Sequence, residues 1–252
     1  MIIAITQARM SSSRCPGKVL KPILGYPMVW HQWTRMQQAQ SLDLAIMATS
    51  TDISDDPLAN YFIQNKQEVF RGSLNNVLNR YYECAKHYQA SHVVRLTADC
   101  PLLDPSIIDK VVEEHLNKDN DYTSTSLFPV GMSAEVIRFS ALEKAYYEAK
   151  LRSQREHVTL FIYQHPELFK LGKLSNTENL SHLRWTVDYP EDFDFVLRIY
   201  QKLYPQNSQF TMEDVLSLLR EQPELITINA HMEHNGLAKS LAKDGTMTYL
   251  DD

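Results

Sequence analysis

Short apolar runs alternate with longer amphipathic segments along the first half of the chain. The apolar runs are rich in β-branched and other hydrophobic residues, which predicts strands at 2–6, 42–49, 68–71 and 91–97. The intervening segments repeat apolar positions every three or four residues, which predicts helices at 27–40, 56–64, after a cap at Ser73, and at 104–116. Strands and helices that alternate in this way indicate an α/β fold, with a mostly parallel sheet covered by helices on both faces.

The alternation changes after residue 121. Strand-like stretches at 123–128, 134–138 and 169–174 surround a turn at 129–131 and helical stretches at 140–151 and 154–165. We therefore expect a small β insertion or lobe at 122–174. The run RWTV at 184–187 has the composition of a core strand, and helices are predicted at 190–203 and 212–220. Residues 231–252 are polar with weak periodicity, so no element is predicted there.

Composition narrows the possible classes of protein. The 252 residues are 44% hydrophobic and 22% charged, with only 7 glycines, which is typical of one globular domain spanning 1–252. A net charge of −6 gives no general attraction for nucleic acid, so a phosphate site would need a local cluster of cations. Cys15, Cys84 and Cys100 form no CxxC pair, which excludes a Cys-rich zinc site and fits a reducing compartment. Residues 1–5 are too short for a signal peptide and no run could span a bilayer, so we expect a cytoplasmic protein without a membrane partner.

The loop after the first predicted strand concentrates cations and hydroxyls. Ligands bind at the carboxyl ends of strands in an open parallel sheet, where arginine holds phosphate oxygens bidentately and backbone N–H groups can surround an anion. This loop therefore suits a polyphosphate, although it matches neither the P-loop nor the dinucleotide pattern. The alternative is a solvated basic loop, and composition leaves both interpretations open. The residues concerned are Arg9, Ser11, Ser12, Ser13, Arg14 and Lys18.

Two aspartates follow predicted strands at what would be the same edge of the sheet. Asp99 comes after the strand at 91–97, and Asp188 comes after the run at 184–187. Mg²⁺ prefers oxygen ligands and is commonly held by one or two carboxylates together with substrate phosphates, so both are candidate Mg²⁺ ligands. The alternatives are that Asp99 forms a turn ahead of Pro101 and that Asp188 favours a helix N-terminus, the role we assign to Asp192.

Residues 8–18 resemble the A-R-x-x-S-x-R-x-P-G-K signature of sugar-acid cytidylyltransferases, the family of CMP-Kdo and CMP-sialic acid synthetases. Every signature position is present in order. The SpsF-like branch of spore coat polysaccharide biosynthesis is the most similar, through FRGS with NVLNRY at 70–81, RLTADCP at 95–101 and REHVT at 155–159. The resemblance covers roughly residues 1–200. Asn76 stands where relatives carry an acidic residue, which puts a carboxylate role there in doubt.

This resemblance implies a Rossmann-like fold of the nucleotide-diphospho-sugar transferase type and the transfer of CMP from CTP, with Mg²⁺, to a sugar acid or another acidic or phosphorylated acceptor. Pyrophosphate would be released, in cell-surface polysaccharide or glycan biosynthesis. Asp99 and Asp188 would bind Mg²⁺. The catalytic cations would be Arg9, Arg14 and Lys18, and the nucleotide would also contact Ala8, Ser11, Ser12, Ser13, Arg71 and Thr97.

The acceptor pocket is expected where relatives build it, and the family usually forms homodimers through its β lobe, here 122–174. The candidate acceptor residues are Gly131, Glu135, Arg155, Glu156 and His157. No residue decides between a 2-keto sugar hydroxyl and a phosphate or phosphonate oxygen. Two other functions stay open: a nucleotidyltransferase or glycosyltransferase of the same fold that uses UTP or a nucleotide sugar, and a non-catalytic nucleotide-binding subunit. The single aspartate in Thr97-Ala98-Asp99 is less than the D-x-D motif typical of glycosyltransferases.

Overall fold

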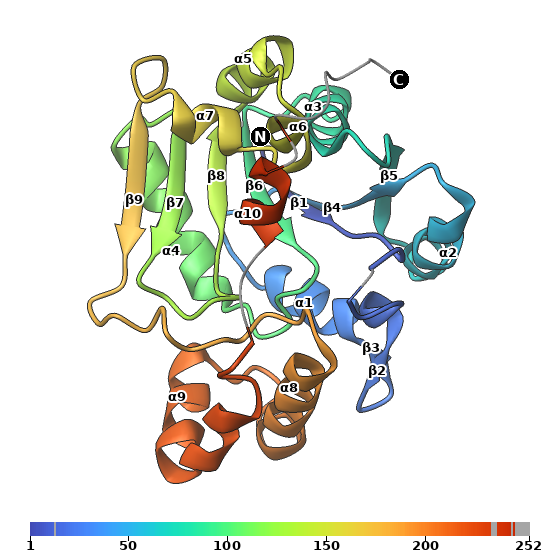
Figure 1. The fold of residues 1–252 in the computed structure, drawn as a ribbon, viewed down its shortest axis with the longest axis vertical. Helices are drawn as coiled ribbons and strands as arrows, with labels where there is room; N and C mark the ends of the chain where they lie inside the picture. The colour runs from blue at the N-terminus through green and yellow to red at the C-terminus, as the bar shows by residue number, and fades with distance from the viewer. Residues whose placement is uncertain (13, 233–235, 243, 245–252) are drawn as a thin grey trace.

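The computed structural model describes residues 1–12, 14–232, 236–242 and 244. Its main sheet has seven strands (Figure 1), of which β8 runs antiparallel to both of its neighbours while the other neighbouring pairs are parallel. In spatial order the strands are β5 (Glu68–Gly72), β4 (Leu44–Ser50), β1 (Ile2–Gln7), β6 (His92–Thr97), β8 (Glu135–Arg138), β7 (Tyr122–Ser126) and β9 (Leu171–Ser175).

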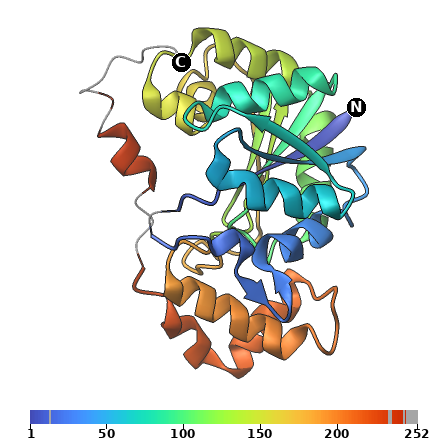
Figure 2. The ribbon, with the colours of Figure 1, turned by 90° about the vertical axis from the view of Figure 1, so that its right-hand side faces the viewer.

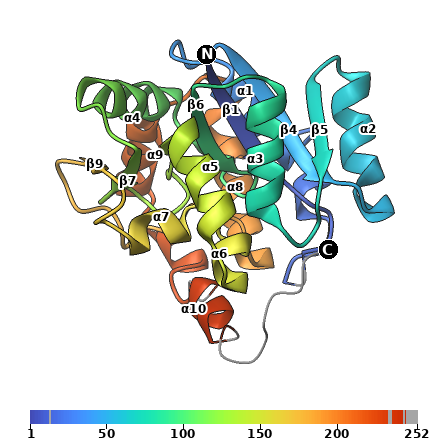
Figure 3. The same cartoon turned by 90° about the horizontal axis from the view of Figure 1, so that it is seen from above.

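Helices cover both faces of this sheet because its strands are apolar on both sides. In β1, Ile3 and Ile5 face a core that includes α3 (Val77–His87), α5 (Phe139–Glu148) and α7 (Leu160–Gln164). Ala4 faces the opposite core, with α1 (Met28–Met36), α2 (Asp56–Gln64) and α4 (Pro105–Asn117). Figure 3 looks down on α3 and α5 lying over the strands. The predicted α/β class, with a mostly parallel sheet and helices on both faces, is confirmed.

A third apolar core lies beyond the carboxyl ends of the parallel strands. It is formed by α8 (Pro190–Leu203), α9 (Met212–Glu221) and the 3-10 helix η3 (Pro223–Ile228), which Figure 2 shows below the sheet. Trp185 is buried in this core together with Ile23 from the small hairpin of β2 (Pro22–Ile23) and β3 (Tyr26–Pro27). The sequence pattern did not predict this hairpin, because each of its strands has only two residues.

The region 122–174 supplies β7, β8 and β9, which extend the main sheet, while the small separate sheet is the hairpin of β2 and β3. The helix expected at 154–165 is two short helices, α6 (Arg152–Glu156) and α7, because Val158 between them has a φ of 51°. The strand expected at 184–187 is wrong. This segment is extended but forms only an isolated bridge between Arg184 and Val130.

The cap of α3 also differs from the prediction. Asn76 is the N-cap and its side chain accepts from the backbone N of Asn79, while Ser73 accepts from the backbone N of Asn76 one step earlier. In the C-terminal region, where no element was predicted, the described residues include α10 (Gly236–Leu241). None of the described helices has the length and apolar character that crossing a membrane requires.

Gly131 allows two segments to come into backbone contact at the edge of the sheet. Its φ is +105°, and a Cβ there would lie 2.5 Å from the backbone N of Thr186. The Val130 backbone N donates to Leu183 O at 2.9 Å, and Trp185 N donates to Val130 O at 2.6 Å. Gly131 is therefore required by the close approach of 130–131 to 183–186, and its predicted acceptor role stays a prediction.

We expect Gly131→Ala to lower the free energy of unfolding by about 2–5 kcal/mol, because the new Cβ meets backbone atoms that cannot move independently. Gly25→Ala is the matched control, since Gly25 has a φ of +89° and nothing within 4 Å of the added Cβ. That control isolates the cost of the positive φ, about 1–2 kcal/mol. Urea unfolding of both variants measures the difference, and equal losses would show that the contact with 185–186 is unimportant.

Candidate active site

The loop that follows β1 is closed on itself at Met10. The backbone O of Met10 accepts from Ser12 N at 2.9 Å and from Gly17 N at 3.3 Å. Gly17 has a φ of 67°, a conformation that glycine adopts without strain. Lys18 follows at the start of the 3-10 helix η1 (Lys18–Leu20). The closed loop thus holds Arg14 and Lys18 at the carboxyl edge of the sheet.

Lys18 lies between the two aspartates that the sequence singled out. Its Nζ is 3.3 Å from Asp188 Oδ1 and 3.8 Å from Asp99 Oδ2. The side chains of Lys18 and Asp188 are each 11% exposed and that of Asp99 is 27% exposed. One ammonium group therefore lies within 3.8 Å of both carboxylates, so the ends of two distant segments converge at Lys18.

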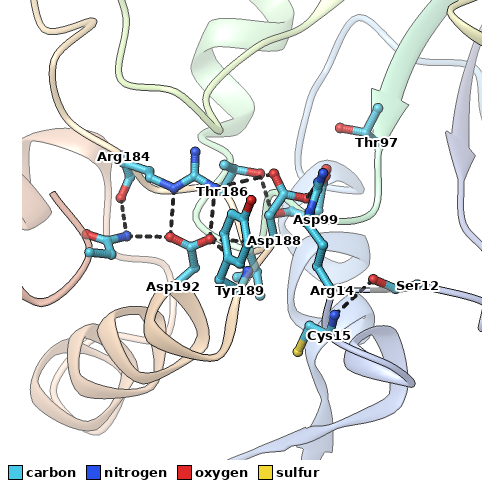
Figure 4. Close-up of polar contacts among 12 residues, drawn as sticks. Ser12, Arg14, Cys15, Thr97, Asp99, Arg184, Thr186, Asp188, Tyr189 and Asp192 are labelled. Atoms are coloured by element: carbon cyan, nitrogen blue, oxygen red, sulfur yellow. Dashed lines mark hydrogen bonds and ion pairs between the residues drawn. The ribbon is translucent and has the colours of Figure 1, made fainter. Parts of the chain in front are cut away.

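Arg14 completes this cluster from the loop (Figure 4). Its Nη2 is 2.7 Å from Asp188 Oδ1, and its guanidinium lies over the Tyr189 ring at 5.2 Å from the centroid. Burial alone would raise the pKa of Asp188, but the charges of Lys18 and Arg14 hold that pKa below its ordinary value. Asp188 is consequently an anion at neutral pH, as a metal ligand must be.

A fully buried carboxylate, Asp192, fixes the turn that carries Asp188. It accepts from Arg184 Nε at 2.8 Å, from Arg184 Nη2 at 2.9 Å, and from the backbone N of both Asp188 and Tyr189 at 2.9 Å. Asn229 Nδ2 adds a further bond at 2.9 Å. Asp192 does lie in the first turn of α8, but the sequence analysis missed its role as a buried anchor. The spacing of Arg184, Asp188 and Asp192 at four-residue intervals was the available signal.

Backbone pairing brings this turn to the end of β6. Val187 N donates to the backbone O of Asp99 at 2.8 Å, and the hydroxyl of Thr186 donates to the same oxygen at 3.2 Å. Arg184 Nη2 is also 3.3 Å from Asp188 Oδ2, so both oxygens of Asp188 have cationic partners. Figure 4 shows Asp99 and Asp188 facing each other with Arg14 beside them.

The described loop residues also assigned to the nucleotide differ in exposure. Arg9 is exposed, and no ion pair joins it to another residue that the structure describes. Ala8 is buried, Ser11 is exposed, and Ser12 Oγ accepts from Cys15 N at 3.3 Å. Ser13 lies outside the described residues. The nucleotide contacts assigned to these residues stay predictions.

Arg71, proposed for the cytosine, is held by the turn after β4. Its Nε donates to Ser50 O at 2.7 Å, its Nη2 donates to Asp52 O at 3.0 Å, and its Nη1 pairs with Asp56 at 2.7 Å. Thr97, at the end of β6, is partly buried, with its hydroxyl 3.5 Å from Cys100 Sγ. All three guanidinium nitrogens of Arg71 are thus engaged with the protein, and contact with a base stays a prediction.

Glu135 is surrounded by hydrogen-bond donors. It forms a short ion pair with Arg95, its register partner across β8 and β6, and it accepts a short bond from the hydroxyl of Tyr122. The hydroxyl of Thr159 donates to Glu135 at 2.9 Å. Three internal donors therefore occupy this carboxylate, which the sequence analysis assigned to the acceptor.

The other three acceptor candidates lie in and just after α6 and engage different neighbours. Arg155 donates to Tyr146 O at 2.8 Å, and Glu156 accepts from Ser240 at 3.1 Å. Burial lowers the pKa of His157, and its Nε2 is buried without a partner among the described residues. The contacts found here do not bring Arg155, Glu156 and His157 to one point, and their acceptor role stays a prediction.

Comparison with known proteins is consistent with this geometry. The chain is 32% identical to the spore coat polysaccharide biosynthesis protein SpsF of Bacillus subtilis, over 90% of this chain and 97% of that protein. It is 25% identical to the 3-deoxy-manno-octulosonate cytidylyltransferase of Trichlorobacter lovleyi, over 73% of this chain and 85% of the relative. A solved cytidylyltransferase structure from Leptospira borgpetersenii is similar with a TM-score of 0.86 and 28% identity, over 92% of this chain and 99% of that one.

The residues that form the cluster lie inside the region that defines the family. The sequence model of the family described as cytidylyltransferase matches residues 3–222, which contain Arg14, Lys18, Asp99 and Asp188. Since this match spans most of the chain and includes the site, the chain belongs to the cytidylyltransferase family.

Proposed function

We propose that the protein transfers CMP from CTP, with Mg²⁺, to a sugar acid or a related acidic or phosphorylated acceptor, and releases pyrophosphate. The observation that carries this proposal is the contact of Lys18 Nζ with both Asp99 and Asp188, at the edge where Arg14 also lies. The cations that would bind a triphosphate thus lie in direct contact with the carboxylates that would bind a metal. The names of the relatives SpsF and 3-deoxy-manno-octulosonate cytidylyltransferase support a role in cell-surface polysaccharide synthesis, which we place in the cytoplasm.

The chemistry of the donors fits Mg²⁺. Asp99 and Asp188 present oxygen ligands within 3.8 Å of a single atom, Lys18 Nζ, so one ion could reach both. Among the described residues, no group of three or more His, Cys, Asp or Glu is arranged to hold a metal ion. Mg²⁺ commonly takes one or two carboxylates and fills its other positions with phosphate oxygens and water. When bound, Mg²⁺ would neutralise charge on the α-phosphate and lower the proton affinity of the acceptor oxygen.

In the proposed reaction an acceptor oxygen attacks the α-phosphorus of CTP. The bond from that phosphorus to the oxygen bridging the β-phosphate breaks, and the bond electrons leave with pyrophosphate. Arg9, Arg14 and Lys18 would bind the triphosphate and stabilise the charge on the departing pyrophosphate. A more acidic acceptor oxygen loses its proton readily to water, so positioning contributes more than a dedicated base.

The contacts of Asp188 imply that nucleotide and metal bind cooperatively. Arg14 and Lys18, which we assign to phosphate, are paired with carboxylates that we assign to Mg²⁺. A triphosphate must displace these carboxylates from the cations, and a metal then compensates their negative charge. Each ligand therefore removes part of the cost of binding the other, which is positive cooperativity with a favourable, negative coupling free energy.

Two other functions are distinguished by the nucleotide that the protein uses. A UTP-dependent transferase or a glycosyltransferase of the same fold would prefer UTP or a nucleotide sugar over CTP. A non-catalytic subunit would bind CTP without turnover and without dependence on Mg²⁺. The interleaved cations and carboxylates favour the catalytic cytidylyltransferase, because a binding module has no need of paired metal ligands.

The first test is pyrophosphate release from CTP and Mg²⁺ with a panel of sugar-acid and phosphorylated acceptors. We expect Lys18→Ala and Asp99→Asn each to lower kcat by about 10²–10³-fold, because each removes charge stabilisation near the reacting phosphates. Lys110→Ala, an exposed lysine of α4, is the control and should keep wild-type activity. No pyrophosphate with any acceptor, together with unchanged CTP affinity in both variants, would reject the proposed function.

The second test measures CTP binding by calorimetry with and without Mg²⁺. Asp188→Asn should bind CTP roughly 3- to 30-fold more tightly than wild type in the absence of metal, because Arg14 and Lys18 lose a competing anion. The same variant should lose most of the gain in affinity that Mg²⁺ gives the wild type. Asp194→Asn, an exposed carboxylate paired with Arg198 in α8, should change neither value. If Asp188→Asn binds CTP without metal no more tightly than the wild type does, the proposal that the triphosphate displaces Asp188 from Arg14 and Lys18 is wrong.

A further inference from the structure

A fully buried carboxylate, Asp55, lies beneath the start of the loop after β1. It ends the 3-10 helix η2 (Ile53–Asp55), between β4 and α2, and it is 0% exposed. Its Oδ1 accepts from the backbone N of Met10 at 2.7 Å, across 45 positions of sequence. Its Oδ2 accepts from the backbone N of Ser50 at 3.2 Å and from the Ser50 hydroxyl at 2.5 Å. Asp55 therefore ties the end of β4 to the first residue after Arg9.

Met10 is the residue at which the loop closes, so its orientation determines that of the loop. The peptide N–H of Met10 is held by Asp55, and its carbonyl accepts from both Ser12 N and Gly17 N. A rotation at Met10 would move both of these bonds. The residues on either side, Arg9 and the closed loop through Lys18, carry the cations assigned to the triphosphate.

The partners of Asp55 require a carboxylate at this position. Both oxygens accept, and their partners are two backbone N–H groups and a hydroxyl. An asparagine side chain has one acceptor oxygen and one NH₂ group, so either orientation would turn the NH₂ toward a backbone N–H, of Met10 or of Ser50. A buried donor without an acceptor costs more than the average hydrogen bond contributes.

Two neighbouring arginines link Asp55 to its surroundings. Arg80 is 2% exposed, its Nη1 donates to Ser73 O at 3.2 Å, and its Nε is buried without a partner in the described part of the chain. Burial lowers the pKa of Arg80 and the charge of Arg9 lowers it further, while the negative charge of Asp55 opposes this. Arg71 holds the turn from Ser50 to Asp56 that carries Asp55, through its bonds to Ser50 O and Asp52 O.

We infer that Asp55 is a positioning residue for the triphosphate, acting through the backbone of Met10, and that Arg71 acts at one further remove by holding the turn of Asp55. The inference rests on the proposed function, since it concerns the site assigned to the triphosphate. It gives Arg71 a role that does not involve the nucleobase. Asp55 does not touch the nucleotide in this role.

The test compares CTP with CMP in the presence of Mg²⁺, using calorimetry on the full chain. CMP carries the same base and sugar but lacks the β- and γ-phosphates, so the ratio of the two dissociation constants isolates the triphosphate contribution. We expect Asp55→Asn to weaken CTP binding by roughly 10- to 100-fold, because the loop loses a charge-assisted hydrogen bond. CMP binding should change by less than about threefold.

Two controls separate positioning from loss of stability. Ser50→Ala removes one donor to Oδ2 but keeps the bond from Met10 to Oδ1, so its CTP to CMP ratio should stay near wild type. Thr123, in β7, is a buried hydrogen-bond partner of both His115 and Asn120. Thr123→Val removes these bonds, and should lower Tm while leaving the ratio unchanged. If Asp55→Asn does not fold, Arg71→Gln loosens the same turn and should likewise weaken CTP binding more than CMP binding.

The outcomes also distinguish this inference from the proposed function. If the wild type binds CTP no more tightly than CMP, the assignment of the triphosphate site itself is wrong. If the wild type prefers CTP and Asp55→Asn keeps that preference, only the role of Asp55 is overturned. Equal weakening of CTP and CMP in Asp55→Asn would likewise overturn it, because a purely structural carboxylate affects both nucleotides alike.

Discussion

The backbone of 183–187 pairs with Val130 and with the carbonyl of Asp99, and this pairing determines where Asp188 lies. Asp188 is 170 positions from Lys18 in sequence, and no local preference could bring their side chains together. Gly131 permits the close approach of 130–131 to 185–186 because it carries no Cβ. Asp192 then fixes the turn after Val187 by accepting from the backbone N of Asp188. The chemistry of the site therefore depends on a few backbone contacts between segments that are far apart in the sequence.

Charge balance explains how this cluster is stable with little exposure to solvent. The cluster has three positive charges, on Arg14, Lys18 and Arg184. These cations pair with three carboxylates, those of Asp99, Asp188 and Asp192. Removing any one of them leaves an opposite charge partly buried and unpaired, which is far costlier than losing a surface pair. A bound triphosphate and metal would preserve the alternation of charges while changing the partners.

The sequence was sufficient for the parts of the structure that depend on local patterns. Periodicity predicted the parallel strands and their helices, and it placed Asp99 and the cationic loop directly after strands, where the structure has them. The strand at 184–187 was predicted wrongly because RWTV is buried and has the composition of a core strand, yet its backbone partners are loops instead of a neighbouring strand. The break at Val158 has no signal in the sequence, since a β-branched residue does not favour a φ of 51°. The buried role of Asp192 was missed because a charge in the first turn of a helix is usually exposed, and one of its donors, Asn229, lies 37 positions away.

Burial separates the carboxylates of the site into two kinds. Asp55 and Asp192 are 0% exposed, and each accepts from two backbone N–H groups, which cannot leave without unfolding the local chain. Asp99 and Asp188 keep some exposure and bind side-chain cations, which can rotate away toward a ligand. A carboxylate that must exchange partners during binding has to be reachable by solvent and held by mobile groups. The same residue type is therefore a fixed support where it is sealed from water, and is suited to exchanging partners where solvent reaches it.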